Sequence, residues 1–177
     1  AQAKRVAPTS ITVLIGGETG TGKERVARLL HRFSGRSGGF YAINCGAMTE
    51  TVLQSELFGA SRGAFSGADR DRPGLFEAAD RGTLFLNGID HLCPATQLWL
   101  ARILRSGQFA APGQSDPQRV GFRLIAGSAA DLRQAAAEGR FSPDLYHAIA
   151  LGCLVMPPLA DRREDIPVLA HHLLSDA

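Results

Sequence analysis

Short apolar runs alternate along this chain with segments whose apolar residues recur at helical spacing. The runs at residues 11–17, 39–44, 82–87, 122–128 and 151–159 each predict a strand, and we expect those at 11–17 and 82–87 to be buried. Helices are predicted directly after residue 22 and at residues 49–59, 95–107, 131–139 and 163–174. This alternation is typical of an α/β fold, in which a mostly parallel sheet is covered by helices on both faces.

Individual side chains add detail to these elements. Thr51 and Gln54 have the spacing of a capping box at the start of the second helix, and Asp131 is the expected N-cap of the fourth. Trp99 lies in an apolar helix, so we expect it in the core. His31 falls on the polar side of the first helix, where we expect it to be solvated.

A glycine-rich loop joins the first strand to the helix after it. Gly17, Gly22 and Lys23 satisfy the pattern G-x-x-x-x-G-K, in which backbone N–H groups and the lysine ammonium surround phosphate oxygens. A buried strand before the loop and an amphipathic helix after it are the context that this pattern requires. Glu24 stands where Ser or Thr normally offers a hydroxyl to Mg²⁺. The predicted phosphate site consists of Gly17, Glu18, Thr19, Gly20, Thr21, Gly22, Lys23 and Glu24.

Composition narrows the class of protein. The chain has 177 residues, of which 45% are hydrophobic and 20% charged, as expected for one globular domain. A net charge of +2 gives little attraction to nucleic acid, so we expect DNA contact only through a domain outside this chain. No apolar run could span a bilayer and no signal peptide is visible. We therefore expect no membrane contact. The three cysteines are far apart in the chain, which indicates free thiols in a reducing compartment and no metal site, so we expect a cytoplasmic protein.

Seven segments, taken in order, resemble one protein family. The segments are GETGTGKE, INCGAM, SELFG, GAFSGA, GLFEAADRGTLFL, DLY and PPLADRREDIP. They resemble the AAA+ domain of the sigma-54-dependent bacterial transcription activators, the enhancer-binding proteins. The resemblance implies a P-loop NTPase (AAA+) three-layer sandwich, with residues 1–158 as the α/β core and residues 159–177 as the start of a helical lid. Members of the family are ATPases that form rings and use ATP turnover to remodel sigma-54 RNA polymerase at the promoter.

The segment GAFSGA is the most specific of the seven, because the family's own loop has the sequence GAFTGA. The resemblance implies that Phe65 is the tip that contacts sigma-54, and that Ser66 replaces a threonine while keeping its hydroxyl. An ordinary surface loop is the alternative. The implied contact residues are Gly63, Ala64, Phe65, Ser66, Gly67 and Ala68.

Positions that carry the family's ATPase chemistry hold other residues in this chain. Where the family has Asp-Glu, to hold Mg²⁺ and to activate water, this chain has Asn87 and Gly88, a degenerate Walker B motif. The family's sensor Asn falls on Ala129, and its two arginines that act in trans fall on Ser142 and Ala148. We therefore expect a degenerate member whose ATP hydrolysis is weak or lost.

Three other positions have open interpretations. Asn44 matches the family's switch residue, which hydrogen-bonds the catalytic Glu, but an Asn that caps a turn at the strand end is the alternative. Asp90 lies three residues beyond Asn87, so it would need an unusual turn to take the place of the missing acid. Arg162 belongs to a mixed-charge helix start, with a role at a ring interface as the alternative.

These patterns favour a transcription-regulatory AAA+ domain that binds ATP or ADP, with Mg²⁺ held weakly, and that contacts sigma-54 RNA polymerase. Self-association into a ring is expected, with the help of segments outside this chain. One alternative is an active ATP-driven remodeller whose missing groups come from other positions or subunits. Another is an interaction module without nucleotide, which would bind a protein partner or a cyclic dinucleotide.

Overall fold

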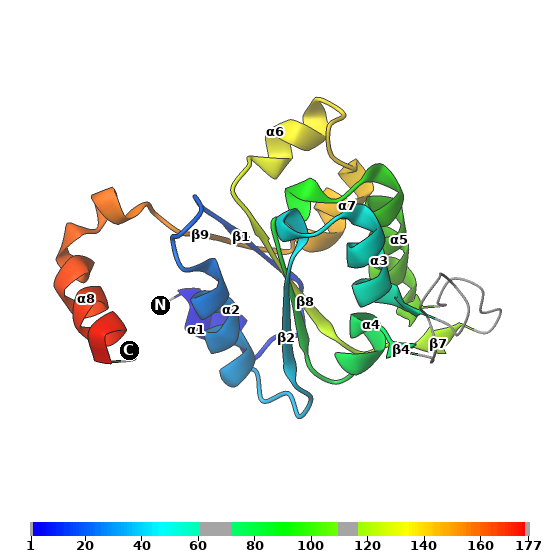
Figure 1. Cartoon of the computed structure of the whole chain (residues 1–177), viewed down its shortest axis with the longest axis horizontal. Helices are drawn as coiled ribbons and strands as arrows, with labels where there is room; N and C mark the ends of the chain where they lie inside the picture. Colours follow the sequence, from blue (N-terminus) through cyan, green and yellow to red (C-terminus); the bar gives the residue numbers. More distant parts are fainter. Residues whose placement is uncertain (1, 61–71, 110–116, 176–177) are drawn as a thin grey trace.

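A five-stranded parallel sheet forms the centre of the protein, for which a computed structural model describes residues 2–60, 72–109 and 117–175. Its strand order is β2-β5-β8-β1-β9, and every neighbouring pair is parallel (Figure 1). The predicted mostly parallel sheet is confirmed. The strands are β1 (Val13–Gly16), β2 (Phe40–Asn44), β5 (Thr83–Asn87), β8 (Arg123–Ser128) and β9 (Gly152–Val155).

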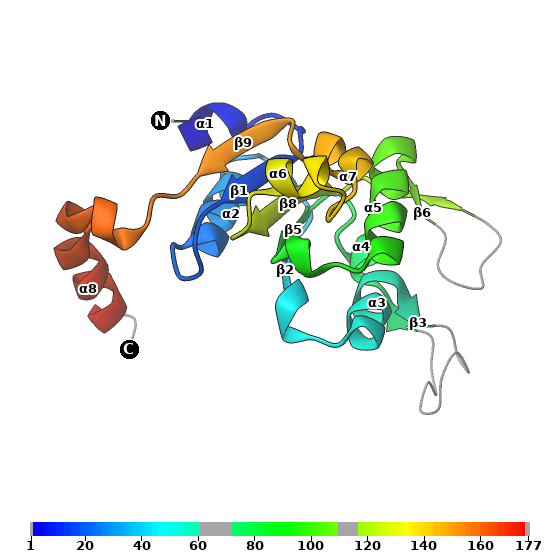
Figure 2. The same cartoon turned by 90° about the horizontal axis from the view of Figure 1, so that it is seen from above.

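Helices cover both faces of this sheet, as predicted (Figure 2). Two helices lie on one face, α1 (Gln2–Val6) and α2 (Lys23–Arg32). The other face is covered by α3 (Glu50–Phe58), α4 (Leu75–Ala78), α5 (Pro94–Ser106), α6 (Leu132–Ala137) and α7 (Pro143–Ile149).

Two short hairpins and four 3₁₀ turns complete the described elements. The hairpins pair β3 (Gly59–Ala60) with β4 (Arg72–Pro73), and β6 (Gln108–Phe109) with β7 (Gln118–Arg119). The turns are η1 (Cys45–Ala47), η2 (Ile89–His91), η3 (Leu159–Asp161) and η4 (Arg163–Asp165). After η4, α8 (Ile166–Ser175) stands apart from the sheet, beyond α2 in Figure 1. The assignment of residues 159–177 to a helical lid stays a prediction.

Side chains of the central strands point alternately into two hydrophobic clusters, one on each face of the sheet. In β5, Leu84 and Leu86 join the cluster under α3–α7, whereas Phe85 joins the cluster under α1 and α2. Leu124 and Ile125 of β8 divide in the same way. Burying each large apolar side chain stabilises the fold by about 1.5–3 kcal/mol, so this double-sided burial holds the strand ends in place.

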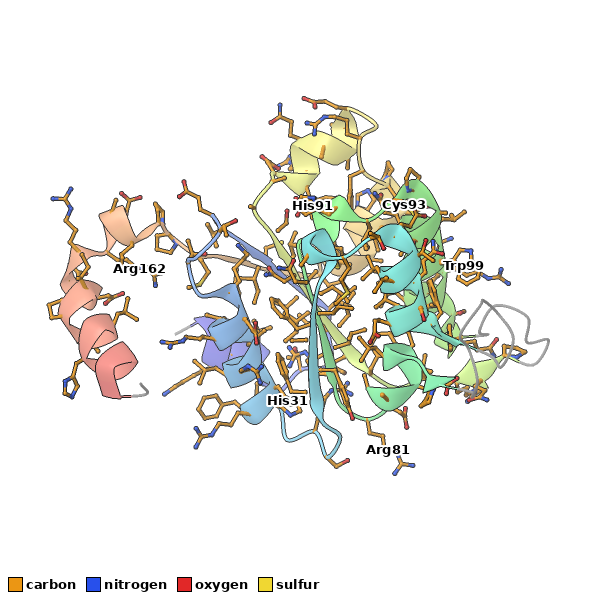
Figure 3. The ribbon with its side chains drawn as sticks, viewed as in Figure 1. His31, Arg81, His91, Cys93, Trp99 and Arg162 are labelled. Atoms are coloured by element: carbon orange, nitrogen blue, oxygen red, sulfur yellow. The ribbon has the colours of Figure 1, made fainter. Side chains whose placement is uncertain are left out.

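Some local predictions are wrong. The capping box fails because α3 begins at Glu50 after Thr49, so that Thr51 and Gln54 both lie inside the helix. Trp99 is 41% exposed and lies on the outer side of α5, with one edge contact to Phe58 (Figure 3). The helix α7 was missed, because its sequence PDLYHAI has too few turns for a clear period.

The prediction for His31 is also wrong. Its Nδ1 lies 2.9 Å from Oγ1 of Thr83, and its ring contacts Phe40. Asp131, in contrast, caps α6 as predicted, because its side chain accepts hydrogen bonds from the N–H groups of Arg133 and Gln134.

Candidate nucleotide site

The glycine-rich loop leaves β1 and turns directly into α2. Gly17, Gly20 and Gly22 have φ angles of +149°, +85° and +93°, which residues with a Cβ rarely adopt. A Cβ on Gly17 would also lie 2.7 Å from the backbone O of Met156, so the loop packs closely against the chain that follows β9. The loop ends at the N-terminus of α2, where the first N–H groups have no partner within the helix. This backbone is therefore shaped to bind an anion.

Lys23 begins α2 and is buried. Its Nζ donates hydrogen bonds to the backbone O of Gly17 at 2.6 Å and of Glu18 at 2.9 Å. An ammonium has three donors, so one is left for a phosphate oxygen. Burial lowers the pKa of Lys23, and the negative charge of Asp90 acts in the opposite direction.

Glu24 does not replace the missing hydroxyl of the phosphate loop. Its carboxylate forms an ion pair of 2.7 Å with Arg28, one turn later on α2. The Arg28 guanidinium in turn lies 4.7 Å from the centre of the Phe40 ring. The Glu24 side chain is thus engaged on the outer surface of the helix.

The degenerate Walker B residues end β5 beside the end of β2. Asn87 pairs with Asn44 across the two strands. Gly88 has a φ angle of +71°, and a Cβ there would lie 3.0 Å from Cδ2 of His91 and 3.6 Å from Oδ1 of Asn44. Asn44 caps the turn η1, since its Oδ1 accepts a hydrogen bond from the N–H of Gly46. The turn-capping interpretation of Asn44 therefore describes what it does in this structure.

A cavity of about 440 Å³ lies between the glycine-rich loop and the strand ends. Its size suits a small ligand, because ligand sites in proteins usually have volumes of about 300–1,000 Å³. Carboxyl ends of parallel strands meet at one edge of a sheet, which is where α/β folds bind ligands. The predicted residues that line the cavity are Thr19, Gly20, Gly22, Lys23, Glu24, Asn44, Asn87, Gly88 and Ala129.

The positions matched to the family's two trans arginines lie on α7, away from this cavity. Ser142 caps α7, because its Oγ accepts a hydrogen bond from the N–H of Leu145 at 3.3 Å. Its own N–H donates to Oε1 of Gln97 at 2.7 Å. Ala148 follows within the helix. Neither side chain carries a charge.

Two charged residues near the cavity were not assigned to it from the sequence. Asp90 lines it, three residues beyond Asn87. Arg162 donates a hydrogen bond of 2.7 Å to the backbone O of Thr21 in the glycine-rich loop. The sequence contains one hint of Asp90, since Gly88 permits a sharp turn after the strand. It contains none of Arg162, which is 141 residues from its partner.

The predicted sigma-54 contact residues 63–68 lie outside the described residues. The strands β3 and β4 flank them, with Gly59 paired to Pro73 and Ala60 to Arg72. In the described part of the chain, no helix has the length and apolar character needed to cross a membrane.

The parallel sheet, the glycine-rich loop and the cavity at the strand ends define the chain as a P-loop NTPase of the AAA+ class. Residues 1–154 match the model of the sigma-54 interaction domain, and the chain belongs to this family. It is therefore an AAA+ domain of the type found in sigma-54-dependent activators.

Individual relatives agree with this assignment. The C4-dicarboxylate transport transcriptional regulatory protein DctD of Rhizobium meliloti is 46% identical over 98% of this chain and 38% of its own length. NtrX from Brucella abortus in complex with ATP is 34% identical over 98% of this chain and 39% of that chain, with a TM-score of 0.87. Its complex with ADP has 35% identity and a TM-score of 0.85, over 96% and 37% of the two chains. The chain thus spans about two fifths of the length of these relatives.

Proposed function

We propose that this domain binds ATP or ADP through Gly17–Lys23 and hydrolyses ATP weakly or not at all. The observation that carries the proposal is the combination of residues around one cavity. The buried ammonium of Lys23 lies on one side of it, and Asn87 and Gly88 lie at the strand end where the family's acids would be. The site keeps the groups that attract phosphate and has exchanged those that activate water.

Phosphate binding needs little beyond what the loop offers. The N–H groups at the start of α2 and the third donor of Lys23 point to the same ligand class, an anionic phosphate. NtrX binds ATP and ADP, and nearly the whole of this chain is similar to a part of NtrX. Together these points support a nucleotide as the ligand.

Hydrolysis also needs a base for the attacking water and positive charge for the transferred phosphate. Gly88 has no side chain to act as the base, and loss of a general base typically lowers a rate by a factor of about 10²–10⁴. The missing arginines have a larger expected effect, because an arginine finger contributes about 10³–10⁵. Ser142 and Ala148 stand in their positions, and we therefore expect nucleotide to act as a conformational ligand.

The wider role follows from family membership. We infer that residues 63–68 contact sigma-54 RNA polymerase and that the domain assembles into a ring, whereas DNA is contacted by another domain. The free thiols of Cys45, Cys93 and Cys153 fit the cytoplasm as the place of action.

Calorimetric titration with ATP and ADP tests nucleotide binding. We expect binding by the chain and its loss in Lys23→Ala, with Lys4→Ala as the control because Lys4 is an exposed lysine on α1. Phosphate release is measured on the same samples, and we expect none above the background of Lys23→Ala. Turnover typical of an active remodeller would overturn the hydrolysis part. Absence of heat with either nucleotide would overturn the binding part and favour a protein or cyclic-dinucleotide ligand.

A further inference from the structure

The chain reverses direction sharply after β5 and returns Asp90 to the strand end. Gly88 adopts a left-handed conformation (φ 71°, ψ 43°), and its N–H donates to the backbone O of Gly127 at 2.8 Å. The N–H of His91 then donates back to the O of Gly88, which closes the turn η2. Ile89 is fully buried and anchors the turn. This is the unusual turn that Asp90 needs in order to reach the site.

The carboxylate of Asp90 is only partly satisfied. Its Oδ1 is buried and has no hydrogen-bond partner in the described part of the chain. Its Oδ2 lies 3.6 Å from Nε2 of His91, whose side chain is largely exposed. A buried carboxylate oxygen without a partner is costly, because it loses its water and gains nothing in return. Asp90 also lines the ligand cavity and its side chain is 19% exposed, so a bound ligand has access to the carboxylate.

Asp90 is also the carboxylate of the cavity that is available for a cation. Of the cavity's two carboxylates, Glu24 is engaged by Arg28. Asp90 is close enough to Lys23 for its negative charge to affect the pKa of the ammonium. This charge raises the pKa, whereas the larger effect of burial lowers it. Mg²⁺ in nucleotide sites is typically held by one or two carboxylates together with phosphate oxygens and water. Among the described residues there is no group of three acidic, His or Cys side chains that could hold a metal by itself, which fits a metal brought in with the nucleotide.

We propose that Asp90, and not the residue at position 87, supplies the carboxylate that holds Mg²⁺ in this nucleotide site. The inference depends on the proposed function, since the metal would be shared with the phosphates of ATP. The observation that suits Asp90 to the metal is a carboxylate in the lining of the phosphate cavity, one of whose oxygens has no hydrogen-bond partner among the described residues. Asn87 would then contribute a neutral amide beside it. The acid has moved three residues along the chain, from the end of the strand to the turn that follows it.

Asp90 could instead serve as the counter-ion of Lys23. The two roles have opposite effects on the affinity for ATP when Mg²⁺ is present. A carboxylate that holds Mg²⁺ tightens ATP binding only when the metal is present. A carboxylate that only neutralises Lys23 repels phosphate equally with and without the metal.

The experiment measures the dissociation constant of ATP in Mg²⁺ and in excess EDTA for the chain, for Asp90→Asn and for Asp144→Asn. Asp144 is an exposed carboxylate on α7 and serves as the matched control. We expect Mg²⁺ to tighten ATP binding by about tenfold or more in the unmodified chain and in the control, and by less than about threefold in Asp90→Asn. Electron paramagnetic resonance of Mn²⁺ in the presence of ATP gives a second readout. We expect a smaller fraction of the Mn²⁺ to be bound to Asp90→Asn than to the unmodified chain.

Each other outcome has a definite meaning. An undiminished Mg²⁺ effect in Asp90→Asn, or no Mg²⁺ effect in the unmodified chain that still binds ATP, would overturn the inference but leave the proposed function standing. If Asp90→Asn binds ATP more tightly than the unmodified chain does, and by the same factor in Mg²⁺ and in EDTA, then Asp90 is the counter-ion of Lys23 and the inference is overturned. Absence of ATP binding in the unmodified chain would overturn both proposals. Asp90→Ser, a smaller replacement, provides the same comparison if the asparagine variant fails to fold.

Discussion

The guanidinium of Arg162 donates a hydrogen bond of 2.7 Å from Nη2 to the backbone O of Thr21, in the middle of the glycine-rich loop. Arg162 lies between η3 and η4, on the segment that connects β9 to α8 (Figure 3). Its Nε is buried without a hydrogen-bond partner in the described part of the chain, and its Nη1 lies 4.0 Å from Oδ2 of Asp165. One side chain thus connects the phosphate loop to the start of the terminal segment.

Arg162→Met should therefore weaken both the fold and nucleotide binding. A hydrogen bond from a charged group contributes about 1.5–3 kcal/mol, and partial exposure places Arg162 near the lower end. We expect the free energy of unfolding to fall by about 1–2 kcal/mol and the dissociation constant of ATP to rise about three- to tenfold. Chemical denaturation and calorimetry measure the two quantities. Arg163→Met is the control, because Arg163 is exposed, and equal effects of the two substitutions would exclude a specific role for Arg162.

Restoring the acids at positions 87 and 88 should not restore ATP turnover. In Asn87→Asp with Gly88→Glu, the new Cβ at position 88 would lie 3.0 Å from Cδ2 of His91 on a left-handed backbone. That conformation costs a residue with a Cβ about 1–2 kcal/mol, so we expect the double variant to be less stable by about this amount. Phosphate release should stay at the background of Lys23→Ala, since no arginine stands at Ser142 or Ala148.

Two single variants separate these causes. Gly88→Ala isolates the backbone cost, and Asn87→Asp isolates the effect of the charge. Robust phosphate release by the double variant would show that the trans arginines are dispensable, and that the acids alone limit hydrolysis. Thermal unfolding of all three variants tests the predicted strain at position 88.

The parts of the fold that were predictable are those encoded by local periodicity. The buried strand at Thr83–Asn87 has four consecutive fully buried residues, so its apolar run was easy to recognise. The strand order was not predictable, because it depends on pairings such as Val13 with Ile125, far apart in the chain. Trp99 was misplaced because an apolar helix can still expose large side chains on its outer side, here Leu98 as well as Trp99.

The site was predictable as far as its motif is contiguous. The glycines and Lys23 adopt the loop that the pattern requires, because their conformations are local. Asp90 was considered but not assigned to the site, because it needs a turn whose geometry depends on Gly127. Arg162 was not connected with the loop, because its partner Thr21 is 141 residues away in the chain. The exchanged residues Asn87 and Gly88 were found by resemblance to the family. The resemblance shows which catalytic residues are missing, but not which other residues of this chain take over their roles.

Arg123 should be essential for stability, although it is far from the cavity. It is 1% exposed and donates three hydrogen bonds, from Nη1 to the O of Ala7, from Nη2 to the O of Val6 and from Nε to the O of Ile11. Arg123→Met would leave these acceptors without their donor, at a cost of about 3 kcal/mol or more. For a domain of this size, we expect the midpoint of thermal unfolding to fall by about 6–12 °C.

The control for Arg123 is Arg119→Met, which removes an exposed arginine from β7. We expect the control to change the unfolding midpoint by less than about 2 °C. Comparable shifts in the two variants would mean that the hydrogen bonds of Arg123 contribute little beyond those of a surface arginine. Limited proteolysis near α1 offers a further check, because Arg123 holds that segment against β8.

His31 should make stability depend on pH. Burial lowers the pKa of His31 below its ordinary value of 6.5, and the positive charge of Arg36 acts in the same direction. The unfolded chain therefore binds a proton at higher pH than the folded chain does. The stabilising contribution is fully present above pH 6.5 and is lost as the pH falls through the lowered pKa. Replacing His31 by Gln should remove this dependence, while an amide can still hydrogen-bond Thr83.

Thermal unfolding at about pH 7.5 and about pH 5.5 measures the effect. The unmodified chain should lose more stability on acidification than His31→Gln, so the difference between the two should shrink or change sign at the lower pH. His147→Gln provides the control, because His147 is an exposed histidine on α7. A difference between the chain and His31→Gln that is the same at both pH values would show that His31 keeps its ordinary pKa in the fold, and that its contact with Thr83 does not favour the neutral ring.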